Sequence, residues 1–144
     1  MRWFTRAAGL VAFAISLGNS TFSFGQPFSV EWLPTGTGDW NVGTNWKNLG
    51  FGQNVPTADF AEFAVIANGG TAQVTDTPEG VGGVALLRGT LEILSGGTLN
   101  VVTNNSVQGN VDVVNNGTLS VLSGGTLTAE SAVSRGTMRI TGPT

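Results

Sequence analysis

A short turn motif that recurs at nearly constant spacing is the strongest constraint in this sequence. The motif occurs as Asn68-Gly69-Gly70-Thr71, as Ser95-Gly96-Gly97-Thr98 and as Ser123-Gly124-Gly125-Thr126. Three short strand-like segments accompany each turn at matching offsets. Because glycine supplies the positive φ that a tight corner requires, the repeat predicts a chain that turns at each glycine pair and stacks its strands in three columns.

Within each clean repeat, polar and apolar residues alternate. Thr90-Leu91-Glu92-Ile93-Leu94 is polar, apolar, polar, apolar, apolar, and Thr118 to Leu122 follows the same order. A period of two places the first two apolar residues on one face of a strand. We expect the fifth, represented by Leu94, Val102, Val114 and Leu122, to turn inward at a corner. The pattern predicts an all-β fold, a right-handed parallel β-solenoid of about three coils over residues 59–144.

Stacked coils bring equivalent residues about 4.8 Å apart, and the spacing of the turn motif predicts which residues these are. The expected interior ladders are Ile66–Ile93–Val121, Val74–Val101–Ala129 and Leu86–Val113–Ile140. An antiparallel meander is the alternative, since Asn115-Asn116-Gly117 also suits a hairpin turn. Hairpins, however, do not explain a repeat of every three strands.

Residues 26–58 differ from the repeats because they are rich in tryptophan, glycine and proline. An uncovered terminal coil exposes unpaired backbone groups and an open apolar interior, and large aromatic side chains can cover it. We therefore expect this block to be an N-terminal cap. The alternative is that one or two of its tryptophans form exposed platforms for sugar rings. Trp32, Trp40 and Trp46 are the candidate ligand-binding residues.

The segment from Met1 to Gly25 has the features of a secretory signal peptide. Arg2 and Arg6 precede an apolar run over residues 7–17, and small residues end the segment at Gly25. The apolar run is too short to span a hydrocarbon core of about 30 Å. We expect cleavage after Gly25, a secreted or surface-held product, and no membrane span in the mature chain.

Composition excludes several classes of function. The chain has no cysteine, histidine or tyrosine, and its net charge is −3. A disulfide framework is therefore impossible, and the usual catalytic triads and zinc sites lack their residues. A weakly acidic chain also has no basic patch for nucleic acid. We expect no enzymatic activity and no cofactor.

Two possible sites of chemistry compete with this expectation. Glu92 and Asp112 are the outward carboxylates, expected to stack on Ser120 and Ala85, but they fall in different columns without a basic companion. Asp39, Asn41 and Asn45 are spaced like part of a calcium loop, without the glycine and glutamate of the EF-hand. Asx turns explain them as well, so no metal is expected.

The tryptophan block and the repeats together resemble a known family. Trp32-x7-Trp40-x5-Trp46, followed by Val55-Pro56-x-x-Asp59 and by Gly-Thr-Leu-x-Val units, is similar to secreted bacterial β-helical proteins with autotransporter-associated β-strand repeats. The resemblance covers roughly residues 31–142. It implies a scaffold without an active site, often with a sorting anchor or transporter barrel further along, and residues 1–144 contain the pattern of neither.

These patterns favour an exported, non-catalytic structural or adhesion-type β-helical repeat module of the bacterial cell surface. The alternatives are a carbohydrate-binding module that uses the tryptophan block, or the N-terminal part of a β-helical carbohydrate-active enzyme. Extracellular polysaccharide or cell-surface components are the expected partners. More chain is expected after Thr144, since the repeats end without a closing segment.

Overall fold

The computed structural model describes residues 13–17, 20–24, 29–48, 53–57, 62–78, 80–102 and 109–141. Within these ranges there is no α-helix, and the only helical element is a 3-10 turn at Gly43–Asn45. The protein is all-β, as predicted. In chain order the strands are β1 Phe13–Leu17, β2 Ser20–Phe24, β3 Ser29–Trp32, β4 Thr37–Asp39, β5 Trp46–Asn48, β6 Phe63–Ile66, β7 Thr71–Val74, β8 Gly83–Ile93, β9 Thr98–Asn100, β10 Asn110–Val121, β11 Thr126–Thr128, β12 Ser131–Ser134 and β13 Thr137–Ile140.

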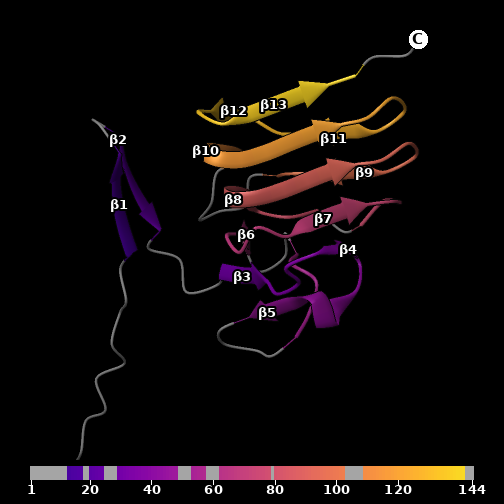
Figure 1. The fold of residues 1–144 in the computed structure, drawn as a ribbon, viewed down its shortest axis with the longest axis horizontal. Coiled ribbons are helices and arrows are strands. Elements are labelled where there is room, and N and C mark those ends of the chain that lie inside the picture. Colours follow the sequence, from indigo (N-terminus) through magenta and orange to yellow (C-terminus); the bar gives the residue numbers. More distant parts are fainter. Residues whose placement is uncertain are drawn as a thin grey trace, which may run out of the picture.

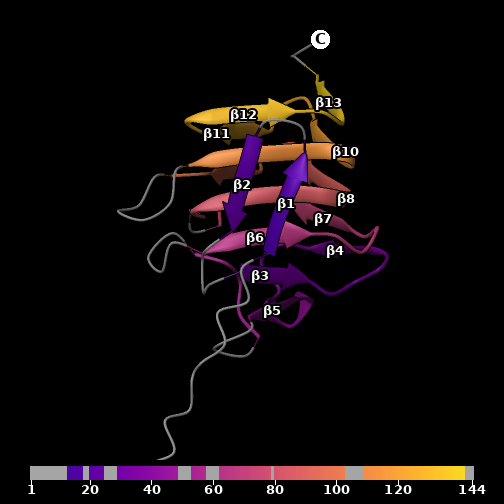
Figure 2. The ribbon, with the colours of Figure 1, turned by 90° about the vertical axis from the view of Figure 1, so that its left-hand side faces the viewer.

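Most strands stack in three parallel rows (Figure 1 and Figure 2). Row 1 contains β3, β6, the first part of β8, the first part of β10 and β12. Row 2 contains β4, β7, the second part of β8, the second part of β10 and β13. Row 3 pairs β9 with β11. The strands within each row are parallel, so an antiparallel meander is not the architecture of these residues.

The strands β8 and β10 serve two rows because each bends without ending. Their register shifts between Val113 and Asn116, which marks the bend in β10. The first turn motif, by contrast, separates two distinct strands, β6 and β7. Consequently this turn lies in register with the bends of β8 and β10, not with the later glycine pairs. The pairs at Gly96-Gly97 and Gly124-Gly125 instead connect row 2 to row 3.

This register corrects the predicted ladders. Ile66 pairs with Leu86, which pairs with Val113, instead of with Ile93. The other long ladder is Val74–Ile93–Val121–Ile140. The prediction was wrong because it aligned turns with the same letters, although the first turn occupies a different corner. The step between Val113 and Leu86 was correct, as were the pairings of Ser120 with Glu92 and of Asp112 with Ala85.

The corner between rows 1 and 2 contains a glycine at each level, and each is followed by a threonine. The four pairs are Gly70-Thr71, Gly89-Thr90, Gly117-Thr118 and Gly136-Thr137. A Cβ atom on Gly117 would lie 2.1 Å from the backbone oxygen of Leu86, and one on Gly136 would lie 2.3 Å from that of Val114. Glycine is therefore required here by close approach of the previous level.

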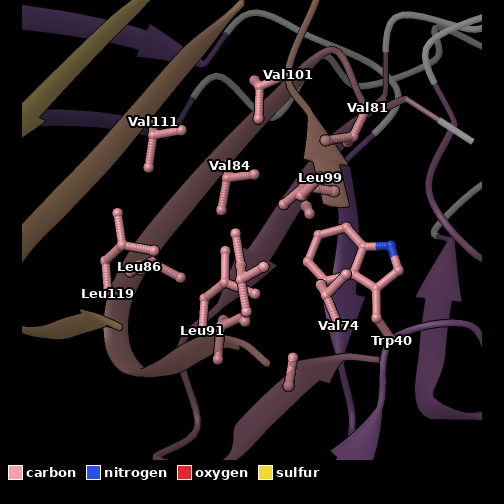
Figure 3. Close-up of a cluster of buried hydrophobic side chains, with 14 of the residues drawn as sticks. Trp40, Val74, Val81, Val84, Leu86, Leu91, Leu99, Val101, Val111 and Leu119 are labelled. Carbon is pink, nitrogen blue, oxygen red and sulfur yellow. The ribbon is translucent and has the colours of Figure 1, made fainter. Parts of the chain in front are cut away.

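Aliphatic side chains from all three rows fill the interior (Figure 3). In Figure 3, Leu86, Leu91 and Leu119 extend from β8 and β10 toward the space that Val74 and Trp40 enter from the other side. Ile93 is fully buried, as predicted. The expected inward turn of every fifth residue was wrong in two cases, because Val102 and Leu122 are 38% and 39% exposed.

The tryptophan block belongs partly to the rows and partly closes them. β3 and β4 pair in parallel with β6 and β7, so strands on both sides of the predicted boundary at residues 58 and 59 share one sheet. β5 then pairs with β3 in the antiparallel direction and ends the stack. Within the predicted leader, β1 and β2 form an antiparallel pair. Its remaining residues, and Gln26 to Phe28 of the cap, lie outside the described residues.

Candidate functional site

The three tryptophans pack on one another at the closed end of the stack. The ring centroids of Trp32 and Trp46 lie 4.8 Å apart with the planes at 72°, and those of Trp40 and Trp46 lie 4.7 Å apart at 69°. Both pairs are edge-to-face, an arrangement that aromatic quadrupoles favour. The indole N–H of Trp46 donates to the backbone oxygen of Trp40 over 2.7 Å. All three side chains belong to the buried core.

This burial argues against the sugar-platform interpretation of Trp32, Trp40 and Trp46. Stacking on a sugar ring needs an exposed aromatic face, and these indoles have none to offer. The indole N–H groups of Trp32 and Trp40 have no hydrogen-bond partner among the described residues. Since both are buried, they cannot serve a ligand without opening of the cap. The arrangement instead supports packing over the first coil.

A buried carboxylate fastens the cap to the rows. Glu62 precedes β6 and is almost fully buried. One of its oxygens accepts from the Asn48 amide over 2.6 Å, and the other accepts from the Thr57 backbone N–H over 2.7 Å. Its backbone oxygen also accepts from the N–H of Gly82. One residue thus joins β5, the segment 53–57 and the start of β8, which is a structural task.

The candidate calcium loop is occupied by internal hydrogen bonds. Asp39 accepts from the backbone N–H of Asn41 over 2.8 Å, the Asx turn that was the alternative interpretation. The side-chain amides of Asn41 and Asn45 donate to Asp76 and to the backbone oxygen of Asp39. Across the part of the chain that the structure describes, no three acidic, histidine or cysteine side chains gather as a metal site would require.

The two outward carboxylates do not converge. Glu92 lies in row 2 and accepts from the Gln73 side-chain amide over 2.9 Å. Asp112 lies in row 1 between Ala85 and Val133. Burial raises the pKa of the Asp112 carboxyl, and the charge of Arg135 opposes part of this rise. Because the carboxylates occupy different rows and different pairings, they form no acid–base pair.

The feature best suited to a functional surface is a polar array along row 2. Its first column is a ladder of threonines at positions 37, 71, 90, 118 and 137. Two residues further along each strand lies a second column, made of Asp39, Gln73, Glu92, Ser120 and Arg139. The threonines are half-buried or exposed. Adjacent rungs of a sheet lie about 4.8 Å apart, so the array offers evenly spaced hydroxyl donors and acceptors.

Sequence reasoning expected threonine ladders but did not find this one complete. The signal was present as the Gly-Thr pairs that begin at Gly70, Gly89, Gly117 and Gly136. The unequal intervals between these pairs hid it, since the longer triplet motif repeats more regularly. Row 3 adds a shorter ladder, in which Thr98 pairs with Thr126.

Comparison of the chain with protein-family models, with curated proteins and with solved structures finds no match. In the described part of the chain, no helix has the length and apolar character needed to cross a membrane.

Proposed function

We propose that the chain is an exported, non-catalytic structural or adhesion-type module of the bacterial cell surface. Its architecture would be a right-handed parallel β-solenoid of about three coils with an aromatic-rich N-terminal cap. The parallel pairing in rows 1 and 2 supports this architecture, because successive strands of one row are separated by strands of the others. A right hand is expected because parallel crossover connections are right-handed in almost all proteins.

The observation that carries the functional proposal is the polar array of row 2. Five threonines stack in register beside a column of polar and charged residues. A surface of this kind can form many weak hydrogen bonds to an extended polar partner, such as a polysaccharide or another surface component. The absence of histidine and cysteine from the sequence agrees with a role in binding or structure rather than catalysis.

Export is the first half of the proposal and can be tested directly. The chain is expressed in a bacterium with a C-terminal tag, and the product is recovered from the medium, the cell surface and the cytoplasm. We expect a product outside the cytoplasm whose first residue is Gln26. A product retained in the cytoplasm with Met1 to Gly25 attached would contradict export.

Adhesion is the second half, and the array gives its test. Purified protein is assayed against a panel of bacterial polysaccharides and whole cells. The variant with Thr90→Val and Thr118→Val keeps side-chain volume but removes two central hydroxyls, and we expect it to bind several-fold more weakly. The matched control carries Thr98→Val and Thr126→Val in row 3 and should bind like the wild type. Equal binding by both double variants would remove the array from the proposal.

A further inference from the structure

The stack has one open end, and it is formed by β11, β12 and β13. Among the described residues, β12 and β13 pair only with β10, and β11 pairs only with β9. Residues 131–135 are all exposed, with Val133 at 44%, and Ile140 is 71% exposed. Behind this edge, Leu127, Ala129 and Met138 are only partly buried although they pack against the core. An edge of this kind is a template for pairing with another strand.

The opposite end cannot receive it. The edge of β3 is already paired with β5, and the tryptophans fill the interior beneath. β5 is three residues long, and its middle residue, Lys47, is exposed. Short edge strands that carry lysine discourage further pairing. Head-to-tail stacking of copies is therefore blocked, and a second copy can offer only its own open end.

We propose that the open end pairs with the open end of a second copy, through an antiparallel contact of β12 with β12 about a two-fold axis. Such an interface is isologous, since the same strand serves both sides. Centring the contact on Val133 places this valine opposite Val133 of the second copy. Facing residues then share the same side of the sheet, as antiparallel pairing requires. This inference is independent of the proposed function.

Charge supports this orientation. Glu130 and Arg135 flank the strand β12, and both are exposed. Antiparallel pairing places Glu130 opposite Gly136 of the second copy, beside its Arg135. The same contact forms again at the other end of the strand, so two opposite-charge pairs frame one apolar centre. Complementary charges of this kind fix the register of an interface more than they add affinity.

The test is the mass of the exported product by light scattering and by sedimentation over a range of concentrations. We expect a dimer that dissociates on dilution. Glu130→Lys should weaken association at least about tenfold, because like charges would then meet twice. Arg135→Glu should do the same, although it also brings a carboxylate near Asp112. The double variant should recover most of the affinity, because its charge pairs are exchanged and still opposite.

Two controls keep the result interpretable. Thr35→Lys adds a positive charge on an exposed turn near the closed end and should leave association unchanged. Circular dichroism and the unfolding midpoint show whether each variant is folded. The charge-exchanged double variant answers the case in which a single variant misfolds. A product that is monomeric at every concentration would overturn the proposal and leave the edge to a following coil of the chain. A dimer that neither single variant weakens would also overturn it.

Discussion

The two ends of the strand stack are built from different kinds of residue. At the first end, β5 closes the edge of β3 while three buried tryptophans and the hydrogen-bonded carboxylate of Glu62 fill the space beneath. At the other end, β12 and β13 pair on one side only, and aliphatic residues of the last level are exposed. The same repeat pattern thus continues to an edge that nothing in the described residues covers.

The comparison teaches that burial in this fold depends on the level as well as on the residue. Val74, Ile93, Val121 and Ile140 occupy one ladder, yet the first three are buried and the last is mostly exposed. In stacked repeats each level is stabilised mainly by its neighbours. Substitutions should therefore cost much in the middle of a ladder and little at its open end.

The largest expected effect comes from introducing a charge into this ladder. Ile93→Asp places a carboxylate in a dry interior, and we expect a loss of more than about 4 kcal/mol of stability or failure to fold. Ile140→Asp is the matched control in the same ladder and should cost less than about 1 kcal/mol. Urea unfolding followed by circular dichroism measures both. Equal midpoints for the two variants would contradict the assigned ladder.

The next effect tests the corner between rows 1 and 2. Gly117→Ala would bring a methyl group to 2.1 Å from the backbone oxygen of Leu86, and we expect a loss of about 2 to 3 kcal/mol. A Cβ atom on Gly36 would meet nothing within 4 Å. Gly36→Ala should therefore change stability by less than about 1 kcal/mol. If both variants unfold at the same temperature, the close stacking at the corner is wrong.

A smaller effect is expected at the closed end. Glu62→Gln keeps the shape of the side chain but turns one accepting oxygen into a donor, which must then face Asn48 or Thr57. We expect a loss of about 1 to 2 kcal/mol, since hydrogen bonds to a charged group are disrupted. Glu31→Gln changes an exposed carboxylate of β3 and should cost less than about 0.5 kcal/mol. Thermal unfolding measures both, and a larger loss at Glu31 would reject the fastening role of Glu62.

The smallest effect is the pH dependence due to Asp112. Its pKa is raised above the ordinary value of 3.8, so the folded state holds this proton more tightly than the unfolded state. Its favourable contribution is complete below 3.8 and is lost as the pH rises through the folded pKa. Asp112→Asn should therefore be slightly more stable than the wild type near neutral pH, with no such advantage in acid. Unfolding midpoints across this pH range would reveal the opposite slope if the carboxyl were instead stabilised as an anion.

Much of the fold follows from local pattern. Alternation identified the buried positions of β8 and β10, such as Leu91, Ile93 and Leu119, because a strand with one buried face must alternate. The spacing of the turn motif correctly related β8 to β10, as in the pairing of Glu92 with Ser120. The glycine pairs before β9 and β11 marked true corners.

The errors arose where spacing and letters disagreed with contact. Gly70 resembles Gly97 in sequence but stacks on the corner of Gly89, because the first level turns between rows 1 and 2 with a longer motif. Tryptophan burial could not be read from composition, since a capping indole and a sugar platform have the same local sequence. The role of Glu62 depends on contacts with Asn48 and Thr57, to which the repeat pattern gives no clue.

The register of row 2 is tested most directly by pairs of cysteines in this cysteine-free chain. Thr71 pairs directly with Thr90 in the structure, whereas the triplet motif would align it with Thr98. Disulfides form when Cα atoms lie about 4.4 to 6.8 Å apart. We predict that the variant with Thr71→Cys and Thr90→Cys closes a disulfide on mild oxidation, and that Thr71→Cys with Thr98→Cys does not. Efficient closure of the second pair in place of the first would contradict the stacked register on which the polar array and the two unlike ends depend.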